Sequence, residues 1–319
     1  MPDHSAIDPF LLSRFRCPLC AATPLSQAGD ELTCHGCGTR YPVSHGRPVL
    51  FRPDNDMFAA DDYRRPPALP GDGGGKRGLA RYVPEPSVNL AAHRVVPHLS
   101  TLLPGHAAIL VVGAGGQRAW VDPMLGAAGR RIVYCDVDVR ASVDLFCDGH
   151  DLPFVDGSFD AVVTTAVLEH VINPERVAAE IGRVVKLGGY LYSELPFMQQ
   201  VHEGAYDFTR YTLSGHRRLF RNFEEVEAGM VAGPGTTLAW SIENFLLAFA
   251  RAPRARLATK ALARIGFSWL KRFDRMLVDR PEAMDGASCT YLLGRRSAVP
   301  LTNRSIVDRY VGAKHLSHT

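Results

Sequence analysis

Apolar runs of strand length recur between residues 109 and 196 and are separated by polar or amphipathic stretches. The runs are 109–112, 131–137, 159–165 and 190–196. Between the last two, residues 175–186 show helical periodicity, follow Asn173-Pro174 and precede Gly188-Gly189, which predicts a helix capped by the glycines. Alternating strands and helices predict a doubly wound parallel sheet of the α/β class, whose ligand binds at the carboxyl ends of the strands.

Glycines and an acidic residue stand where these predicted strands end. The first run is followed by the turn Gly113-Ala114-Gly115-Gly116, which lets the backbone approach a ligand closely. The second run closes on Asp136, whose carboxylate can accept hydrogen bonds from both hydroxyls of a ribose. These features fit NAD as well as S-adenosylmethionine (SAM). A dehydrogenase is less favoured, because the turn lacks the third spaced glycine of the dinucleotide fingerprint.

Three further segments complete a recognisable pattern: CDGHDLPF at 147–154, DGSFD at 156–160 and LEHV at 168–171. From about residue 90 to 235 the chain resembles the class I SAM-dependent methyltransferases, specifically the methyltransferase type 11 group. The resemblance implies a Rossmann-like sheet of seven strands, the last of them antiparallel. It also implies the residues that bind SAM, with Gly113 and Gly115 under the methionine part, Asp136 at the ribose, Asp148 at the adenine amino group and Leu168 beside the cofactor.

One position departs from the pattern of that group. Two residues before the first glycine the group usually has Asp or Glu, whereas this chain has Val111. Loss of that carboxylate removes a hydrogen-bond acceptor near the glycine turn. A degenerate SAM-binding scaffold protein is therefore one alternative to an enzyme.

The segment 195–212 combines aromatic and ionisable residues in what is predicted to be a loop at the ligand edge of the sheet. It resembles a subset of the type 11 group from polysaccharide and natural-product gene clusters, with the pattern PF…H…DF.RYT…LF. Methyl transfer to oxygen usually needs a base that takes the hydroxyl proton. An unperturbed His titrates near neutral pH, so we expect His202 to be this base or, alternatively, to order the loop; His170 is the second candidate.

Three more residues of this loop are assigned to the substrate side. Asp207 and Arg210 are expected to form an ion pair that fixes the loop, and Tyr211 is expected to line the acceptor pocket.

A helical insertion is predicted at about 236–285, between strands at 223–231 and 288–294. Within 240–273, aromatic and aliphatic residues are interleaved with Arg and Lys, so the helices have an apolar and a basic face. Such helices either cap the active site, with the basic side chains in solvent, or lie on a membrane surface and cover a lipid-linked substrate.

Two CxxC pairs near the N-terminus, Cys17/Cys20 and Cys34/Cys37, predict a structural zinc site, because two such knuckles place four thiolates at the corners of a tetrahedron. Few large apolar residues lie in this region, and structural zinc supplies roughly 10–16 kcal/mol to small domains. The segment resembles the small zinc-ribbon proteins that activate tRNA and translation-factor methyltransferases. The ribbon is either purely structural or recognises a substrate or partner.

The whole chain has 319 residues, 46% of them hydrophobic, and a formal net charge of +3, which demands neither nucleic acid nor an anionic membrane. The sequence contains no apolar stretch long enough to predict a membrane span. The number and pairing of its cysteines favour a reducing cytoplasm. The expected organisation is a zinc ribbon at 1–52, a flexible linker at 53–88 rich in Pro, Gly and charge, a methyltransferase domain at 89–298 and a polar tail at 299–319.

The sequence therefore predicts a SAM-dependent methyltransferase with a structural Zn²⁺, most simply one that methylates a hydroxyl of a small molecule or sugar. That acceptor class, in cell-surface glycan or secondary-metabolite synthesis, follows from the resemblance. An RNA methyltransferase that grips RNA with its zinc ribbon is the other alternative; the near-neutral charge and the lack of an NPPY-type motif argue against it without excluding nucleic acid.

Overall fold

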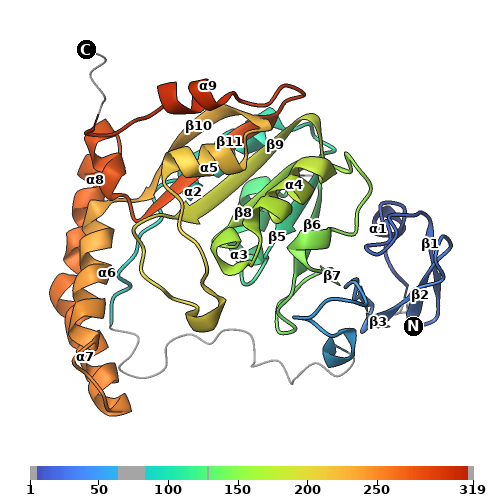
Figure 1. Ribbon diagram of the computed structural model, residues 1–319, viewed down its shortest axis with the longest axis horizontal. Coiled ribbons are helices and arrows are strands. Elements are labelled where there is room, and N and C mark those ends of the chain that lie inside the picture. Colours follow the sequence, from blue (N-terminus) through green and yellow to red (C-terminus); the bar gives the residue numbers. More distant parts are fainter. Residues whose placement is uncertain (1–5, 64–82, 128, 315–319) are drawn as a thin grey trace.

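The computed structural model describes residues 6–63, 83–127 and 129–314, and a seven-stranded sheet forms its centre (Figure 1). The strands are β5 (Ala108–Val112), β6 (Arg131–Asp136), β7 (Leu145–Phe146), β8 (Phe159–Thr165), β9 (Val185–Pro196), β10 (Phe223–Ala232) and β11 (Cys289–Arg296). Their order is β10-β11-β9-β8-β5-β6-β7, and β11 runs antiparallel to both of its neighbours. The predicted Rossmann-like sheet with an antiparallel last strand is confirmed. The two-residue strand β7 was not predicted.

Helices cover both faces of the sheet, because successive residues of its strands point apolar side chains to opposite faces. Ile109 and Val111 pack with α2 (Ala92–Leu102) and α3 (Arg118–Leu125) on one face. Leu110 and Val112 pack with α4 (Pro174–Val184) on the other, which α5 (Leu213–Leu219) also covers. The strand interiors are therefore apolar, and polar side chains gather where the strands end.

The helix predicted to reach residue 186 ends earlier. Asn173 caps the N-terminus of α4 through its side chain, but the helix stops at Val184 and β9 begins at Val185. Gly188 and Gly189 are therefore not a helix cap and lie inside the strand. A Cβ at Gly189 would lie 2.8 Å from the backbone oxygen of Asp160, so close approach of the two strands explains a glycine there.

The N-terminal module is a four-stranded antiparallel sheet that shares its core with the main sheet. Its elements are α1 (Pro9–Leu12), β1 (Leu25–Ala28), β2 (Glu31–Cys34), β3 (Arg40–Ser44) and β4 (Arg47–Pro48). The Phe15 and Phe154 rings lie 5.8 Å apart, and the backbone N–H of Leu50 donates to the Phe146 carbonyl over 2.8 Å. The module is thus packed against the strand edge at β7.

The described part of the expected linker also packs against the main sheet. Tyr63, in the short helix η1 (Ala60–Tyr63), is buried between Phe51 and Phe146 and donates its hydroxyl hydrogen to the carbonyl of Val137. Residues 53–63 therefore run along the carboxyl edge of the strands. The part of the expected linker from 64 to 82 lies outside the described residues.

The insertion between β10 and β11 is helical, as expected. It consists of α6 (Pro234–Leu247), α7 (Pro253–Phe267), η6 (Ser268–Phe273), α8 (Asp274–Leu277) and η7 (Pro281–Gly286). The buried Asp274 carboxylate accepts hydrogen bonds from the backbone N–H groups of Gly235 (2.7 Å) and Thr236 (3.0 Å), at the positive end of the α6 dipole. A short helix α9 (Asn303–Asp308) follows β11. Across the described ranges, none of the helices has the length and apolarity that crossing a bilayer requires.

Two buried hydroxyls hold one fully buried histidine in the core. His216 Nε2 lies 3.0 Å from Ser193 Oγ, and its Nδ1 lies 3.3 Å from Thr290 Oγ1. Burial, with the nearby Arg217 charge, lowers the pKa of His216 to about 3. This histidine therefore stays neutral in the folded protein.

We predict that His216 makes the protein acid-sensitive. A His with a depressed folded pKa binds fewer protons folded than unfolded, so the free energy of unfolding falls as pH drops from about 6.5 towards 3. Between pH 7.5 and 5 the expected loss is about 2 kcal/mol. Urea titrations of His216→Gln should show a smaller loss over this interval, whereas His106→Gln, at an exposed position, should behave like wild type. Equal losses in all three proteins would contradict the assignment.

Candidate active site

A cavity of about 880 Å³ opens at the carboxyl ends of β5, β6 and β8, where a doubly wound sheet binds its ligand. Six of the residues predicted from sequence line it: Gly113, Gly115, Asp136, Asp148, His170 and His202. The segment from Arg52 to Phe58 forms part of its wall, which the sequence did not predict.

The two glycines of the turn after β5 serve different purposes. Both have positive φ, +68° at Gly113 and +45° at Gly115. A Cβ at Gly113 would lie 2.2 Å from Cγ2 of Val167, so packing excludes a side chain there. Apart from its two chain neighbours, no described residue has an atom within 4 Å of a Cβ placed on Gly115, so the turn is open to a ligand at this residue.

Asp136 joins the glycine turn to the end of β6. Its Oδ2 accepts a hydrogen bond from the Gly115 N–H (2.7 Å), and its Oδ1 accepts one from the Asp138 N–H (2.9 Å). Burial raises the pKa of Asp136. Each oxygen keeps one lone pair, which is the acceptor pattern that a ribose diol requires.

Asp148 is fixed by groups from two parts of the chain. It caps the short helix η3 (Gly149–Asp151) and accepts from His150 Nδ1 (2.6 Å) and from Asn55 Nδ2 (2.8 Å). Burial opposes ionisation, but the hydrogen bonds from His150 and Asn55 lower the pKa of Asp148 overall. Asn55 was missed because it lies in a polar segment that resembles a tether, and no local pattern marks it.

Four other predicted residues do not line the cavity. Leu168 is fully buried in the core beneath it. Tyr211 lines a separate hollow beside α4 and α5, because its backbone N–H is bonded to the Pro196 carbonyl and the loop turns away. Asp207 and Arg210 form the expected ion pair, with Arg210 Nη2 at 2.9 Å from Asp207 Oδ2. Arg210 also bonds the carbonyls of Gln199 and Gln200, so the pair holds the loop.

The two candidate bases touch each other beside a buried carboxylate. His170 Nε2 lies 3.0 Å from His202 Nε2. Glu169 Oε1 lies 3.7 Å from the first nitrogen and 3.9 Å from the second. Burial raises the pKa of Glu169 to about 8. Sequence analysis used Glu169 only as part of a motif, since a Glu inside LEH gives no local sign that its side chain points inward.

Val111, the departure from the methyltransferase pattern, does not face the cavity. Its side chain is completely buried among the residues that pack α2 and α3 on the sheet. The missing carboxylate therefore leaves the lining of the cavity unchanged.

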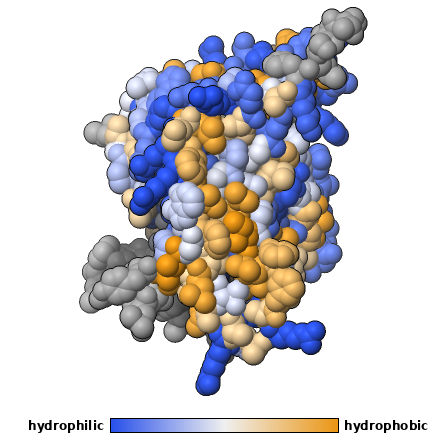
Figure 2. All heavy atoms as spheres, turned by 90° about the vertical axis from the view of Figure 1, so that its left-hand side faces the viewer, coloured by the Kyte–Doolittle hydropathy of each residue, from blue (hydrophilic) through white to orange (hydrophobic). Residues whose placement is uncertain are grey.

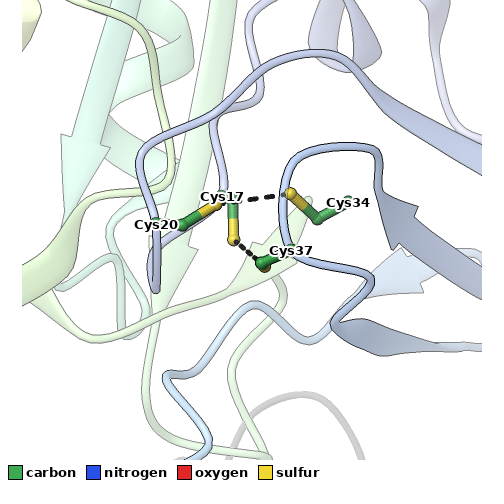
Figure 3. Close-up of side chains that lie close together, drawn as sticks. All are labelled: Cys17, Cys20, Cys34 and Cys37. Atoms are coloured by element: carbon green, nitrogen blue, oxygen red, sulfur yellow. Dashed lines mark hydrogen bonds between the residues drawn. The ribbon is translucent and has the colours of Figure 1, made fainter.

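The four cysteines predicted to bind zinc converge in the N-terminal module (Figure 3). The Sγ atoms of Cys17 and Cys37 are 3.7 Å apart, and those of Cys20 and Cys34 are 3.6 Å apart. Tetrahedral Zn²⁺ with bonds of about 2.3 Å separates its sulfur ligands by roughly 3.8 Å. The donor set thus fits a structural zinc ion. His35 bonds Ser26 Oγ instead, outside the cluster.

Comparison with known proteins supports the methyltransferase fold. Residues 112–193 match the family described as a methyltransferase domain. No curated protein matches the chain. The strand order and the matched segment together support a Rossmann-like methyltransferase fold.

Solved structures with similar folds differ in activity. The cyclase SpnF is 19% identical over 65% of this chain and 82% of its own (TM-score 0.41). A methyltransferase in complex with the Haloferax volcanii Trm112 activator is 19% identical over 64% and 89% (0.40). Haemonchus contortus phosphoethanolamine N-methyltransferase 2, in complex with SAM, is 14% identical over 61% and 50% (0.39). These similarities do not define a reaction.

We predict that the cysteine cluster binds one metal ion through thiolates. Protein reconstituted with Co²⁺ should show sulfur-to-cobalt charge-transfer absorption, because Co²⁺ replaces Zn²⁺ in tetrahedral thiolate sites. Cys34→Ser should reduce this absorption and lower the Tm, whereas Cys289→Ser, at a buried cysteine outside the cluster, should retain the full absorption. Absence of the absorption from the wild-type protein would contradict the zinc site.

Proposed function

We propose that the protein is a SAM-dependent methyltransferase that methylates a hydroxyl group of a small-molecule or sugar acceptor. The proposal rests on one observation. The open glycine turn, Asp136 and Asp148 line the same cavity as His170 and His202. The first three groups suit the cofactor, and the histidines suit an acceptor.

The lining of the cavity fits SAM from end to end. The ammonium and carboxylate of the methionine part would lie against the open backbone at Gly115, and the ribose hydroxyls would donate to Asp136. The remaining lone pair of Asp148, on Oδ2, would accept from the adenine amino group. His170 and His202 line the same cavity and would lie on the acceptor side of the sulfonium methyl.

Methyl transfer then requires an acceptor oxygen in line with the sulfonium and a route for its proton. His202 would take this proton from the hydroxyl as the new C–O bond forms and the C–S bond breaks. Asp207 positions His202, since its Oδ2 accepts from the His202 backbone N–H (2.9 Å).

The charges around the cavity favour a neutral acceptor over RNA. Three arginines line it, and each is paired with a carboxylate: Arg52 with Asp54, Arg140 with Asp138 and Arg176 with Asp151. Further carboxylates lie at Asp56, Asp136, Asp148 and Glu203. Phosphates would meet an excess of negative charge here.

The proposal predicts that the protein binds SAM and not NAD. Calorimetric titration should detect SAM binding, and Asp136→Ala should weaken it about 100-fold or more, because two charged hydrogen bonds to the ribose are lost. Asp138→Ala is the matched control, since Asp138 lies two residues after the end of the same strand but pairs with Arg140. A protein that binds NAD but not SAM, or SAM equally well without Asp136, would contradict the proposal.

A further inference from the structure

Three metal-ligand side chains converge at the acceptor end of the cavity. They are Glu169 and His170, in the short helix η4 (Leu168–His170) after β8, and His202, in the loop after β9. Glu169 is completely buried, and within the described part of the chain neither of its carboxylate oxygens has a hydrogen-bond partner. A buried carboxylate without a partner is costly, and a bound cation would offset this cost.

The outer nitrogens of both histidines face acceptors. His170 Nδ1 lies 2.6 Å from the Tyr206 carbonyl oxygen, which can only accept a hydrogen bond. His202 Nδ1 lies 3.3 Å from the Gln200 carbonyl oxygen and 3.4 Å from Asp207 Oδ2. Each neutral ring therefore carries its hydrogen on Nδ1 and a lone pair on Nε2. Two lone pairs that face each other at 3.0 Å repel unless a positive centre lies between them.

We propose that Glu169, His170 and His202 bind a divalent transition-metal ion such as Zn²⁺. Two histidines and one carboxylate are the ligand set of catalytic sites that keep a position open for substrate. Metal–nitrogen bonds of about 2.0–2.1 Å at angles between 90° and 109° separate two ligand nitrogens by roughly 2.9–3.4 Å, which brackets the observed Nε2 separation. Hydrogen bonds from Nδ1 to a carbonyl or carboxylate are the usual support of a metal-binding histidine.

The role of this ion rests on the proposed function. An acceptor hydroxyl bound to the open position releases its proton to solvent, because a divalent ion lowers the pKa of a bound oxygen. The resulting alkoxide attacks the methyl carbon, the C–O bond forms and the C–S bond breaks. The products are the methyl ether and S-adenosylhomocysteine. When the ion is bound, His202 is its ligand and not the base. The acceptor hydroxyl then loses its proton without a protein base, because the ion lowers the pKa of the hydroxyl.

Metal binding can be measured without turnover. Full-length protein whose thiolate site is filled with Zn²⁺ should bind one further Co²⁺ per chain, with visible absorption of bound cobalt but no sulfur-to-cobalt charge transfer. Glu169→Gln and His202→Gln should bind this ion roughly 100-fold more weakly or worse, since even losing a group that orients a ligand costs about 10–100-fold. Circular dichroism checks that both variants fold.

His98→Gln is the matched control, because His98 also contacts a carboxylate, Glu227, but without a third ligand. It should keep the second ion. A wild-type protein that binds no second Co²⁺ would overturn the inference, as would a second ion that both Gln variants bind at wild-type affinity. Either failure would leave SAM binding intact, so it is distinguishable from failure of the proposed function.

A second, independent observation concerns the surface of the insertion. Six large apolar side chains of α6, α7, α8 and the turn after α6 are 62–73% exposed: Phe245, Phe249, Leu257, Leu262, Ile265 and Met276. Figure 2 shows apolar atoms gathered over this side of the molecule, here called the insertion face. An apolar area of this kind on a protein surface commonly marks an interaction site.

Basic side chains surround the insertion face. From residue 244 to 276 the exposed charged side chains are all basic: Arg251, Arg254, Arg256, Lys260, Arg272 and Arg275. The acids Glu243 and Asp274 are buried, with Glu243 paired to Arg264 (2.8 Å) and Asp274 bonded to the start of α6, whereas the exposed acids Asp279 and Glu282 follow after α8. Apolar and cationic side chains are thereby presented together to the outside.

We infer that the insertion face binds an anionic lipid surface. Anionic headgroups would attract the basic side chains, and the apolar side chains would enter the interfacial region of the bilayer. Amphipathic helices that lie on a bilayer surface bind in this way. The face is connected to the active site, because Gln200 in the His202 loop donates to Ser241 Oγ on α6 over 2.8 Å. If the proposed function holds, an acceptor anchored in the bilayer would enter the cavity from this side.

Vesicle sedimentation of the full-length protein tests this inference. Phosphatidylcholine vesicles containing phosphatidylglycerol should bind at least about 10-fold more protein than pure phosphatidylcholine vesicles, and salt should weaken the binding. The double variants Phe245→Ser/Phe249→Ser and Arg254→Glu/Arg256→Glu should each lose most of it. Leu187→Ser, at a 71% exposed position on β9, is the matched control and should bind like wild type.

Equal binding to both kinds of vesicle, or none, would overturn this inference. So would a stable dimer that Phe245→Ser/Phe249→Ser converts to monomers, because the face would then be covered by a second copy of the chain.

Discussion

Burial of the parallel sheet on both faces is the constraint on which the rest of the structure depends. With helices on either side, every residue of β5 must be apolar, including Val111, and polar chemistry is excluded from the strand interiors. Polar groups can gather only where strands end, and β5 lies between β6 and β8, whose connections leave in different directions. The cavity and its acidic residues lie at this position because the core leaves no other place for them.

The few polar groups that do enter the core show how strongly this constraint acts. Glu194 is bonded by the Tyr192 hydroxyl and the Asn89 amide, and His216 by two hydroxyls, so neither needs an outside partner. Glu169 is equally buried, yet its carboxylate oxygens have no partner within the described part of the chain. A fold that satisfies two buried ionisable groups fully and leaves a third open beside its cavity has reserved that group for a ligand.

The parts of the fold that depend on residues close together in the sequence could be predicted from it. The strand 109–112, the glycine turn and Asp136 follow from apolar runs and their ends, and β11 from a late apolar run. Asn55, Glu169 and the glycines of β9 could not be assigned in the same way, because their roles depend on residues that lie far away in the sequence. Asn55 is 93 positions from the carboxylate that it holds, and Gly189 is needed because another strand passes close by.

The two additions to the sheet both end at the same cavity. The N-terminal module leads into residues 49–58, which begin beside β7, so that Asn55 reaches Asp148 in the cavity. The helical insertion supports the opposite end through Ser241 and the His202 loop. Residues of the segment 52–58 line the cavity itself, whereas the insertion contacts the loop that carries His202. Cofactor affinity should therefore depend on the module, and acceptor choice on the insertion, while the sheet between them supplies the fixed geometry for transfer.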